Sequence, residues 1–247
     1  MSGNFILIMK TVIITGASQG IGRALATTFS NNGYQVLAVY NTSKTKAHEL
    51  LTLKNVDIFK ADVSNGKEVD ALFNYAVKKY GSVDVLINNA GVALKQKTLI
   101  DVSCEEYDSV FNVNVKGVFL CTKNAVNTML NNGGKIINIS SIFGKIGGSC
   151  EVVYSASKSA VIGFTRALSE ELALSNISVC SVILGLVDTN MNAHLSLEDK
   201  LAFVNECGLQ SVPTPSEVAT KIYEICQLSN SELNGKNLNV FTGNALN

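Results

Sequence analysis

The sequence predicts one α/β domain in which about seven parallel strands form a doubly wound sheet with helices on both faces. Three observations favour this fold class. Short apolar runs alternate with longer amphipathic segments along all 247 residues. The short runs are rich in Val and Ile and apolar on both faces, which is typical of strands covered by helices on each side. No linker, internal repeat or low-complexity tract divides the chain, so residues 1–247 are expected to form a single domain.

The alternation predicts the position of each strand and helix. Strands are expected at residues 11–15, 35–40, 56–60, 83–87, 135–140, 177–183 and 237–241. Helices are expected near residues 20–32, 43–53, 66–80, 105–131, 153–174 and 215–228. Because Met9-Lys10 directly precedes the first strand, residues 1–8 are interpreted as an N-terminal extension.

One irregular region, at about residues 184–214, follows the sixth expected strand. It contains Gly185 and a short helical stretch, and the two prolines of the chain, Pro213 and Pro215, lie at its end. Ligands of doubly wound sheets bind beyond the carboxyl ends of the strands, so a long segment there tends to cover a substrate. Residues 190–212 are therefore expected to form a lid. Its apolar side chains line an acyl channel or form the buried side of a small helix.

Charge and composition exclude several classes of protein. The chain has 20 Lys and Arg against 20 Asp and Glu and no polybasic segment, so we expect no nucleic-acid partner. No apolar stretch approaches the roughly 20 residues that span a bilayer, so we expect no membrane insertion. The six cysteines are scattered and only two histidines are present. This pattern predicts no metal site and a reducing compartment, the cytoplasm.

The turn after the first strand supports two interpretations. Residues 16–20 fit G-x-S-x-G, the turn that presents the nucleophilic serine of a hydrolase. Ser18 would then need partners such as Asp188 and His194, and no second motif supports that triad.

The same turn fits a phosphate-binding loop. Gly16 permits the tight turn, Gly20 lets the backbone approach a pyrophosphate, and Gly22 lets the helix pack closely on the strand. The free N–H groups of the helix N-terminus attract the phosphates. In this interpretation Ser18 and Gln19 are hydrogen-bond donors to a cofactor.

A second pattern lies at the start of the helix near residues 153–174. Tyr154 and Lys158 are four residues apart, so the phenol and the ammonium share one helical face. A free tyrosine has a pKa of roughly 10, and the nearby ammonium is expected to lower it toward neutrality. Ser141, at the end of the fifth strand, carries a hydroxyl that can hold a substrate carbonyl. An isolated pair of this kind would be interpreted as two surface residues.

These motifs together resemble the short-chain dehydrogenase/reductase family, which has a Rossmann-like fold. The resemblance covers residues 10–243. It rests on Thr15-Gly16-x-x-x-Gly20-x-Gly22, Asp62-Val63, Asn88-Asn89-Ala90-Gly91, Asn114, Ser141, Tyr154-x-x-x-Lys158 and Asp188-Thr189. A binding-only member of such a family commonly lacks the Tyr or the Lys, and this chain keeps both.

The resemblance implies a role for each motif. Tyr154 is the general acid, Lys158 lowers its pKa and holds the nicotinamide ribose, Ser141 orients the carbonyl, and Asn114 holds a relay water. The implied cofactor-binding residues are Gly16, Ser18, Gln19, Gly20, Ile21, Gly22, Asn41, Ser43, Asp62, Val63, Asn89, Ala90, Gly91, Tyr154, Lys158, Gly185, Val187 and Thr189. Plainer roles stay open for two of these residues, since Asn114 also suits helix packing and Asp62 a strand-end turn.

The second strand bears on the choice between NADP(H) and NAD(H). NAD-binding sheets of this type carry an acid at the end of that strand, which accepts hydrogen bonds from the ribose hydroxyls. Here residues 40–46 read YNTSKTK, and the first acid is Glu49. The hydroxyls, the amide and the two lysines suit a 2′-phosphate, so NADP(H) is expected, with NAD(H) as the alternative. Lys44 and Lys46 also suit the solvated face of a helix.

The substrate follows only from narrower resemblances. The pattern is most similar to 3-oxoacyl-(acyl-carrier-protein) reductases, which implies a carrier-bound ketone. Residues 148–154 and 187–191 are also similar to reductases of the 5-aminopentanone group on elongation factor P. Glu151 would then hold a substrate ammonium, or it is an ordinary acid at a helix N-terminus. Met191 is expected to contact the substrate, and the resemblance implies a homotetramer.

Overall fold

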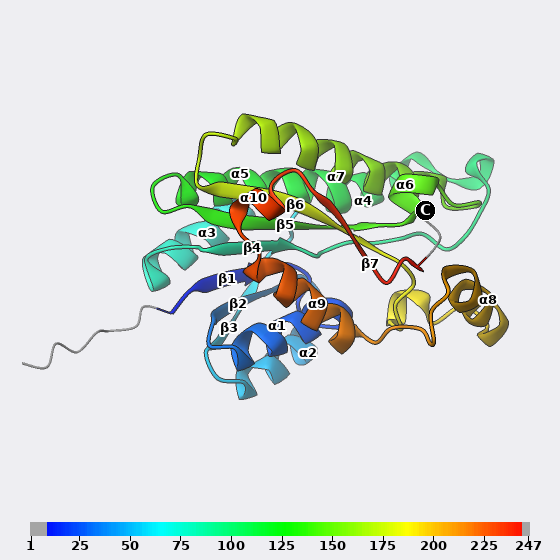
Figure 1. The fold of residues 1–247 in the computed structure, drawn as a ribbon, viewed down its shortest axis with the longest axis horizontal. Coiled ribbons are helices and arrows are strands. Elements are labelled where there is room, and N and C mark those ends of the chain that lie inside the picture. The colour runs from blue at the N-terminus through cyan, green and yellow to red at the C-terminus, as the bar shows by residue number, and fades with distance from the viewer. Residues whose placement is uncertain (1–8, 244–247) are drawn as a thin grey trace, which may run out of the picture.

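The computed structural model describes residues 9–243, so the N-terminal extension expected at residues 1–8 lies outside the described residues. Seven parallel strands form one sheet in the order β3-β2-β1-β4-β5-β6-β7 (Figure 1). This is the doubly wound, Rossmann-like sheet that the sequence predicts. The strands are β1 (Thr11–Ile14), β2 (Gln35–Tyr40), β3 (Val56–Lys60), β4 (Val85–Asn88), β5 (Gly134–Ser141), β6 (Ile177–Leu184) and β7 (Asn237–Val240).

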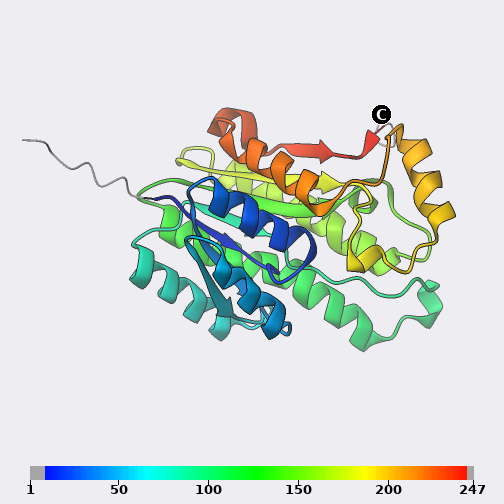
Figure 2. The ribbon, with the colours of Figure 1, turned by 90° about the horizontal axis from the view of Figure 1, so that it is seen from below.

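Helices cover both faces of the sheet (Figure 1). They are α1 (Gly20–Asn31), α2 (Lys44–His48), α3 (Gly66–Tyr80), α4 (Cys104–Phe111), α5 (Gly117–Met129), α6 (Phe143–Ile146), α7 (Val152–Glu171), α8 (Leu197–Cys207), α9 (Pro215–Gln227) and α10 (Asn230–Leu233). Short 3₁₀ turns lie at Glu49–Thr52, Leu99–Asp101 and Asn190–Asn192. Helices α1 and α9 lie side by side on one face (Figure 2), and α3, α4, α5 and α7 cover the other.

The strands are apolar on both faces because each face is a core. In β1, the fully buried Val12 and Ile14 pack in the cluster that contains Phe29 of α1. The intervening Ile13 packs in the opposite cluster, with Leu72 of α3. Alternate side chains of a strand point to opposite faces, so apolar residues are favoured at successive positions of a central strand.

One expected helix is divided in the structure. The single helix expected at residues 105–131 is interrupted by a π-helical turn at Asn112–Lys116, which separates α4 from α5. The short helical stretch expected in residues 184–214 is present as the three-turn helix α8, whose N-terminus is fixed by a capping box between Ser196 and Asp199. No helix within residues 9–243 is long and apolar enough to cross a membrane.

The strand order creates a crevice at one point. The chain leaves β1 toward β2 and β3, and then returns to the other side of β1 with β4. The loops that follow β1 and β4 therefore diverge at the carboxyl edge of the sheet, which is where doubly wound sheets bind ligands.

Candidate active site

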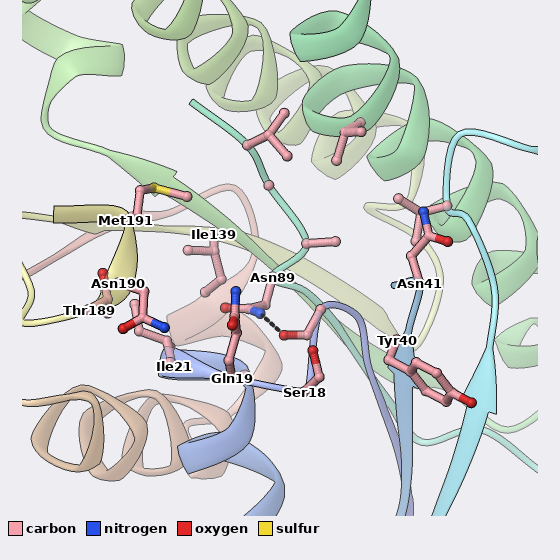
Figure 3. A pocket seen from close by; sticks show the side chains of 18 of the residues that line it. Ser18, Gln19, Ile21, Tyr40, Asn41, Asn89, Ile139, Thr189, Asn190 and Met191 are labelled. Atoms are coloured by element: carbon pink, nitrogen blue, oxygen red, sulfur yellow. Dashed lines mark hydrogen bonds between the residues drawn. The ribbon is translucent and has the colours of Figure 1, made fainter. Parts of the chain in front are cut away.

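A pocket of about 380 Å³ opens at this crevice. In Figure 3 it extends from Met191 and Thr189 on one side, past Gln19 and Asn89, to Asn41 on the other. Every residue that the sequence predicts to bind cofactor lines it. These residues are Gly16, Ser18, Gln19, Gly20, Ile21, Gly22, Asn41, Ser43, Asp62, Val63, Asn89, Ala90, Gly91, Tyr154, Lys158, Gly185, Val187 and Thr189.

The glycine turn is held against the end of β4 by side-chain hydrogen bonds. Asn89 Nδ2 donates to the carbonyl oxygens of Thr15 at 2.8 Å and Gly16 at 3.2 Å. Figure 3 shows Asn89 beside the glycine turn. Thr15 Oγ1 accepts from the backbone N–H groups of Asn89 and Ala90, both at 3.0 Å. A Cβ on Gly16 would lie 2.9 Å from the Cα atom of Ala90, and the residue has a φ of +66°. Only glycine suits that position.

The N-terminus of α1 points its free N–H groups at the pocket. Its N-cap residue, Gln19, is exposed and makes no side-chain capping bond. The first N–H groups of a helix have no intrahelical acceptor and carry the positive end of the helix dipole. This arrangement suits a bound phosphate or pyrophosphate.

Tyr154, Lys158 and Ser141 converge at the far end of the same pocket. Lys158 Nζ lies 5.7 Å from the centroid of the Tyr154 ring, and donates to the carbonyl oxygen of Ile139 at 2.9 Å. The Ser141 hydroxyl accepts from the backbone N–H of Phe143 at 3.2 Å and is a hydrogen-bonding neighbour of Tyr154. Helix α7 and the end of β5 thus deliver three polar groups to one place.

The pKa of Tyr154 departs from the direction that the sequence predicts. The pKa of Tyr154 is raised to about 12, mainly by burial; a hydrogen bond with Ser141 lowers it and the negative charge of Glu151 raises it. Burial also lowers the pKa of Lys158 to about 8. Desolvation penalises the charged form of each group, and burial is the largest cause of both shifts in pKa. The phenol therefore keeps its proton at neutral pH.

Asn114 lies behind the pocket, in the π-helical turn. Its amide accepts from the backbone N–H of Val92 at 2.8 Å, and donates to the carbonyl of Val92 at 2.9 Å and to Ser157 Oγ at 3.0 Å. A Cβ on Gly91 would lie 3.3 Å from Asn114 Oδ1 and 3.5 Å from Lys158 Nζ, so both polar atoms border that glycine. Turns of the π type occur often at functional sites.

Comparisons with known proteins agree with this geometry. The family model described as short chain dehydrogenase matches residues 10–200. The chain belongs to the short-chain dehydrogenase/reductase family. It is 35% identical over 240 residues to the 3-oxoacyl-(acyl-carrier-protein) reductase FabG of Staphylococcus aureus (strain Mu50 / ATCC 700699), which covers 95% of this chain and 97% of the relative.

Solved structures of other proteins have the same fold. One is a 3-ketoacyl-(acyl-carrier-protein) reductase from Brucella melitensis complexed with NADH, with a TM-score of 0.88, 28% identity and coverage of 96% of this chain and 98% of that chain. Another is a short chain dehydrogenase from Burkholderia cenocepacia J2315 in complex with NADP, with a TM-score of 0.87, 26% identity and coverage of 97% and 99%.

Glu151 lies outside the main pocket of this short-chain dehydrogenase/reductase. It lines a small neighbouring pocket that it shares with Tyr154. Glu151 is the N-cap residue of α7, but its side chain makes no capping bond. Burial raises the pKa of its carboxyl, while nearby His194 and a hydrogen bond with Gln96 lower it. The carboxylate therefore interacts with Gln96 and with His194 of the lid segment rather than with the helix backbone.

The hydrolase interpretation finds no triad in this fold. Ser18 lines the main pocket, whereas Asp188 and His194 do not. Asp188 instead forms an ion pair with Lys200 at 3.3 Å, and His194 lies near Glu151.

The plainer role that the sequence leaves open for Asp62 is present in the structure. Its Oδ1 accepts from the backbone N–H of Ser64 at 2.9 Å and from the Ser64 hydroxyl at 2.7 Å, which forms a turn after β3. Asp62 also lines the pocket, so the turn and the cofactor role are compatible.

Sequence reasoning missed Ser157, which is fully buried. Its hydroxyl donates to the carbonyl of Tyr154 at 2.7 Å and accepts from Asn114. Ser157 therefore connects the π-helical turn to the helix that carries Tyr154 and Lys158. The available signal was its position three residues after Tyr154, on the face of α7 turned toward Asn114.

Proposed function

We propose that the protein reduces a ketone to a secondary alcohol with NADP(H), with NAD(H) as the alternative cofactor. The observation that carries this proposal is the convergence of Tyr154, Ser141 and Lys158 in the pocket that the glycine turn also lines. Relatives named as 3-oxoacyl-(acyl-carrier-protein) reductases, and neighbours solved with NADH or NADP, support the same reaction.

The residues present fit a dinucleotide. The uncapped N-terminus of α1 and the backbone at Gly20 suit the pyrophosphate. Asp62 suits the adenine, and Asn89, Ala90 and Gly91 form the wall beside the cofactor. At the far end, Lys158 suits the nicotinamide ribose, with Val187 and Thr189 opposite.

The proton comes from the protein. When bound, a reduced nicotinamide cofactor supplies the hydride, which adds to the carbonyl carbon. The Ser141 hydroxyl holds the carbonyl oxygen, and Tyr154 donates its proton to that oxygen. The raised pKa of Tyr154 keeps the phenol protonated for this step. A water held at Asn114 then returns a proton to Tyr154 through Lys158.

The lid supports a carrier-bound acyl ketone as substrate. Met191 lines the pocket and is 43% exposed, and Leu197 and Leu201 of α8 are 72% and 52% exposed. Met191 in the pocket, and the exposed apolar side chains of the helix that follows it, suit an acyl chain attached to an acyl carrier protein.

A second candidate substrate is a ketone that bears an amine, as in the 5-aminopentanone group on elongation factor P. The supporting observation is the half-buried carboxylate of Glu151, which affects the pKa of Tyr154 and makes no capping bond. A carboxylate there attracts a substrate ammonium. Glu151→Gln should lower kcat/KM for amino-ketones selectively. Equal losses with acetoacetyl thioesters would exclude this role.

The reaction itself is tested by NADPH oxidation with acetoacetyl thioesters, small diketones and amino-ketones. Tyr154→Phe should abolish turnover while leaving the Kd for NADPH, measured by fluorescence, within about twofold of the wild-type value, since the substitution removes only the acidic hydroxyl. A wild-type protein that binds neither NADPH nor NADH would refute the proposal.

We also propose that the protein is a homotetramer formed through α4, α5, α7 and the C-terminal strand β7, and that it is located in the cytoplasm. Support comes from the exposed Tyr107 of α4, Phe119 of α5 and Val152 of α7, which leave apolar surface on this layer. Light scattering should give a mass four times that of the chain, and a monomeric mass would contradict the assembly.

A further inference from the structure

Two side chains of β5 form hydrogen bonds with α7. Asn138 Nδ2 donates to Thr165 Oγ1 at 2.9 Å, and Ser140 Oγ donates to the carbonyl oxygen of Lys158, also at 2.9 Å. All four residues are buried. Helix α7 packs on β5 and β6 (Figure 1), so both bonds lie inside the contact between the sheet and the helix.

The spacing of these residues matches a helix that runs back along the strand. Asn138 and Ser140 are two residues apart, so their side chains point to the same face of β5. Lys158 and Thr165 are seven residues apart, which is about two turns of α7. The later strand residue bonds the earlier helix residue, as an antiparallel arrangement requires. The helix is thus attached to the strand at two points along its length.

Lys158 is attached to β5 by its side chain as well as by its backbone. Its Nζ donates to the carbonyl oxygen of Ile139 at 2.9 Å, and its own carbonyl accepts from Ser140, the next residue of the strand. A displacement of α7 along β5 would break both bonds together. Hydrogen bonds require particular distances and angles, whereas apolar contacts are non-directional, so these bonds select one register of the helix.

We propose that Asn138 and Ser140 set the register of α7 along β5. Through this register they align Tyr154 and Lys158 with Ser141. The inference rests on the proposed function, which gives those three residues their roles in ketone reduction. Ser140 directly precedes Ser141, so its bond to Lys158 fixes the hydroxyl that holds the carbonyl relative to the ammonium. Both Asn138 and Ser140 act through other residues, so they are positioning residues.

Thr165 allows a test at a distance from the chemistry. It does not line the pocket that contains Tyr154, and it lies about two turns further along α7 than Lys158. Thr165→Val removes the acceptor of the Asn138 amide and keeps the shape of the side chain. A loss of turnover in this variant would have to be transmitted through the position of the helix.

Two other residues provide matched controls, because each makes the same kind of bond to a helix other than α7. Thr122 of α5 accepts from Asn88 Nδ2 at 3.0 Å. Ser178 of β6 donates to Asn230 of α10 at 3.2 Å. Both Thr122 and Ser178 are buried. Loss of either bond should lower the urea midpoint of unfolding about as much as loss of a bond between β5 and α7, without removing a bond to α7.

Turnover separates a positioning role from a merely structural one. Ser140→Ala and Thr165→Val should each lower kcat for ketone reduction about tenfold, because a displacement of about 1 Å can cost a reacting group about a hundredfold. KM for the ketone should change less than about threefold, since the pocket keeps its lining residues. Thr165→Ser keeps the acceptor and should retain kcat within about threefold of wild type, as should Thr122→Val and Ser178→Ala.

Hydrogen exchange tests the register independently of turnover. The backbone amides of residues 152–165 should exchange about tenfold faster in Ser140→Ala and Thr165→Val than in the two controls. Unchanged kcat in either of these variants, equal losses of kcat in the controls, or exchange no faster than in the controls would overturn the assignment and leave the reductase proposal intact. If the wild type reduced none of the ketones, the proposed function would fail, and exchange would still decide whether these bonds hold α7.

Discussion

Asn114 Nδ2 donates a hydrogen bond to Ser157 Oγ at 3.0 Å, and Ser157 in turn donates to the carbonyl oxygen of Tyr154 at 2.7 Å. The π-helical turn is thereby connected directly to the first turn of α7. This chain of bonds fixes the helix that carries Tyr154 and Lys158. Ser157 is a positioning residue, since it acts through the backbone of Tyr154.

Ser157→Ala should lower kcat for ketone reduction about tenfold or more, with little change in the Kd for NADPH. It leaves a buried N–H of Asn114 without its acceptor, at a cost of about 1–3 kcal/mol in unfolding free energy. Stopped-flow reduction and urea unfolding measure the two effects. The control is Ser155→Ala, because the Ser155 hydroxyl is buried without a partner among the described residues. Equal effects of the two substitutions would contradict the positioning role.

The pH dependence of reduction should follow Lys158. Below its pKa of about 8 the ammonium is charged, and Tyr154, with a pKa of about 12, is protonated. We expect kcat/KM for reduction to be constant below pH 7 and to fall above pH 8, as Lys158 loses its charge. Lys158→Arg, if active, should move the fall to higher pH, since guanidinium stays charged. A profile that stays flat to pH 9.5 would count against this assignment.

Lys158 should also reduce the stability of the fold. Its pKa falls from 10.5 to about 8 on folding, which corresponds to about 3 kcal/mol of desolvation cost at pH 7. Between these values the unfolded chain binds the proton and the folded protein does not, so the contribution of this residue to stability rises from pH 8 to pH 10.5.

Lys158→Met should therefore raise the unfolding free energy at pH 7, less what is lost with the bond to Ile139. Urea unfolding of both proteins at pH 7 and pH 10 measures the gain, which should shrink at the higher pH. Lys78→Met, at an exposed position of α3, should change stability by less than about 0.5 kcal/mol. A less stable Lys158→Met protein at pH 7 would show that burial of this lysine carries no net cost.

The sequence predicts the sheet well because its strands are buried on both sides. The bounds of β2 and β3 agree with the prediction at both ends. The expected start of β4 at residue 83 is wrong by two residues, because the strand begins at Val85. At the preceding residue, the side-chain carboxylate of Asp84 accepts the hydrogen bond from the Thr11 N–H, at 2.7 Å. A side chain that replaces a ladder bond leaves no trace in hydrophobic periodicity.

In the site, too, some features follow from the sequence and others do not. Motifs locate the cofactor-binding residues, because glycines and strand ends are fixed by the local chain. The pKa of Tyr154 was beyond sequence reasoning, since burial depends on the packing of distant segments. The hydrogen bond of Lys46 with Gln19 could not be predicted either. An exposed lysine fits the hydrophobic pattern of a helix equally well whether or not its ammonium contacts a distant turn.

Gly22, at the start of α1, leaves no space for a side chain. A Cβ there would lie 2.2 Å from the carbonyl oxygen of Gly16 and 2.6 Å from Asn89 Nδ2. The carbonyl belongs to the backbone of the phosphate-binding turn, so it can give way only if the turn opens. Gly22→Ala should therefore weaken NADPH binding about tenfold or more and lower the unfolding free energy by about 1–3 kcal/mol.

Calorimetric titration and urea unfolding measure these two losses, and Gly66→Ala is the matched control. Gly66 is the first residue of α3, and its Cβ would meet only Leu120, at 3.8 Å. Because φ there is not positive, alanine should stabilise the fold by about 0.4–1 kcal/mol, through loss of unfolded-state entropy. If Gly22→Ala bound NADPH as tightly as Gly66→Ala, close packing of α1 against the turn would not be what shapes the phosphate site.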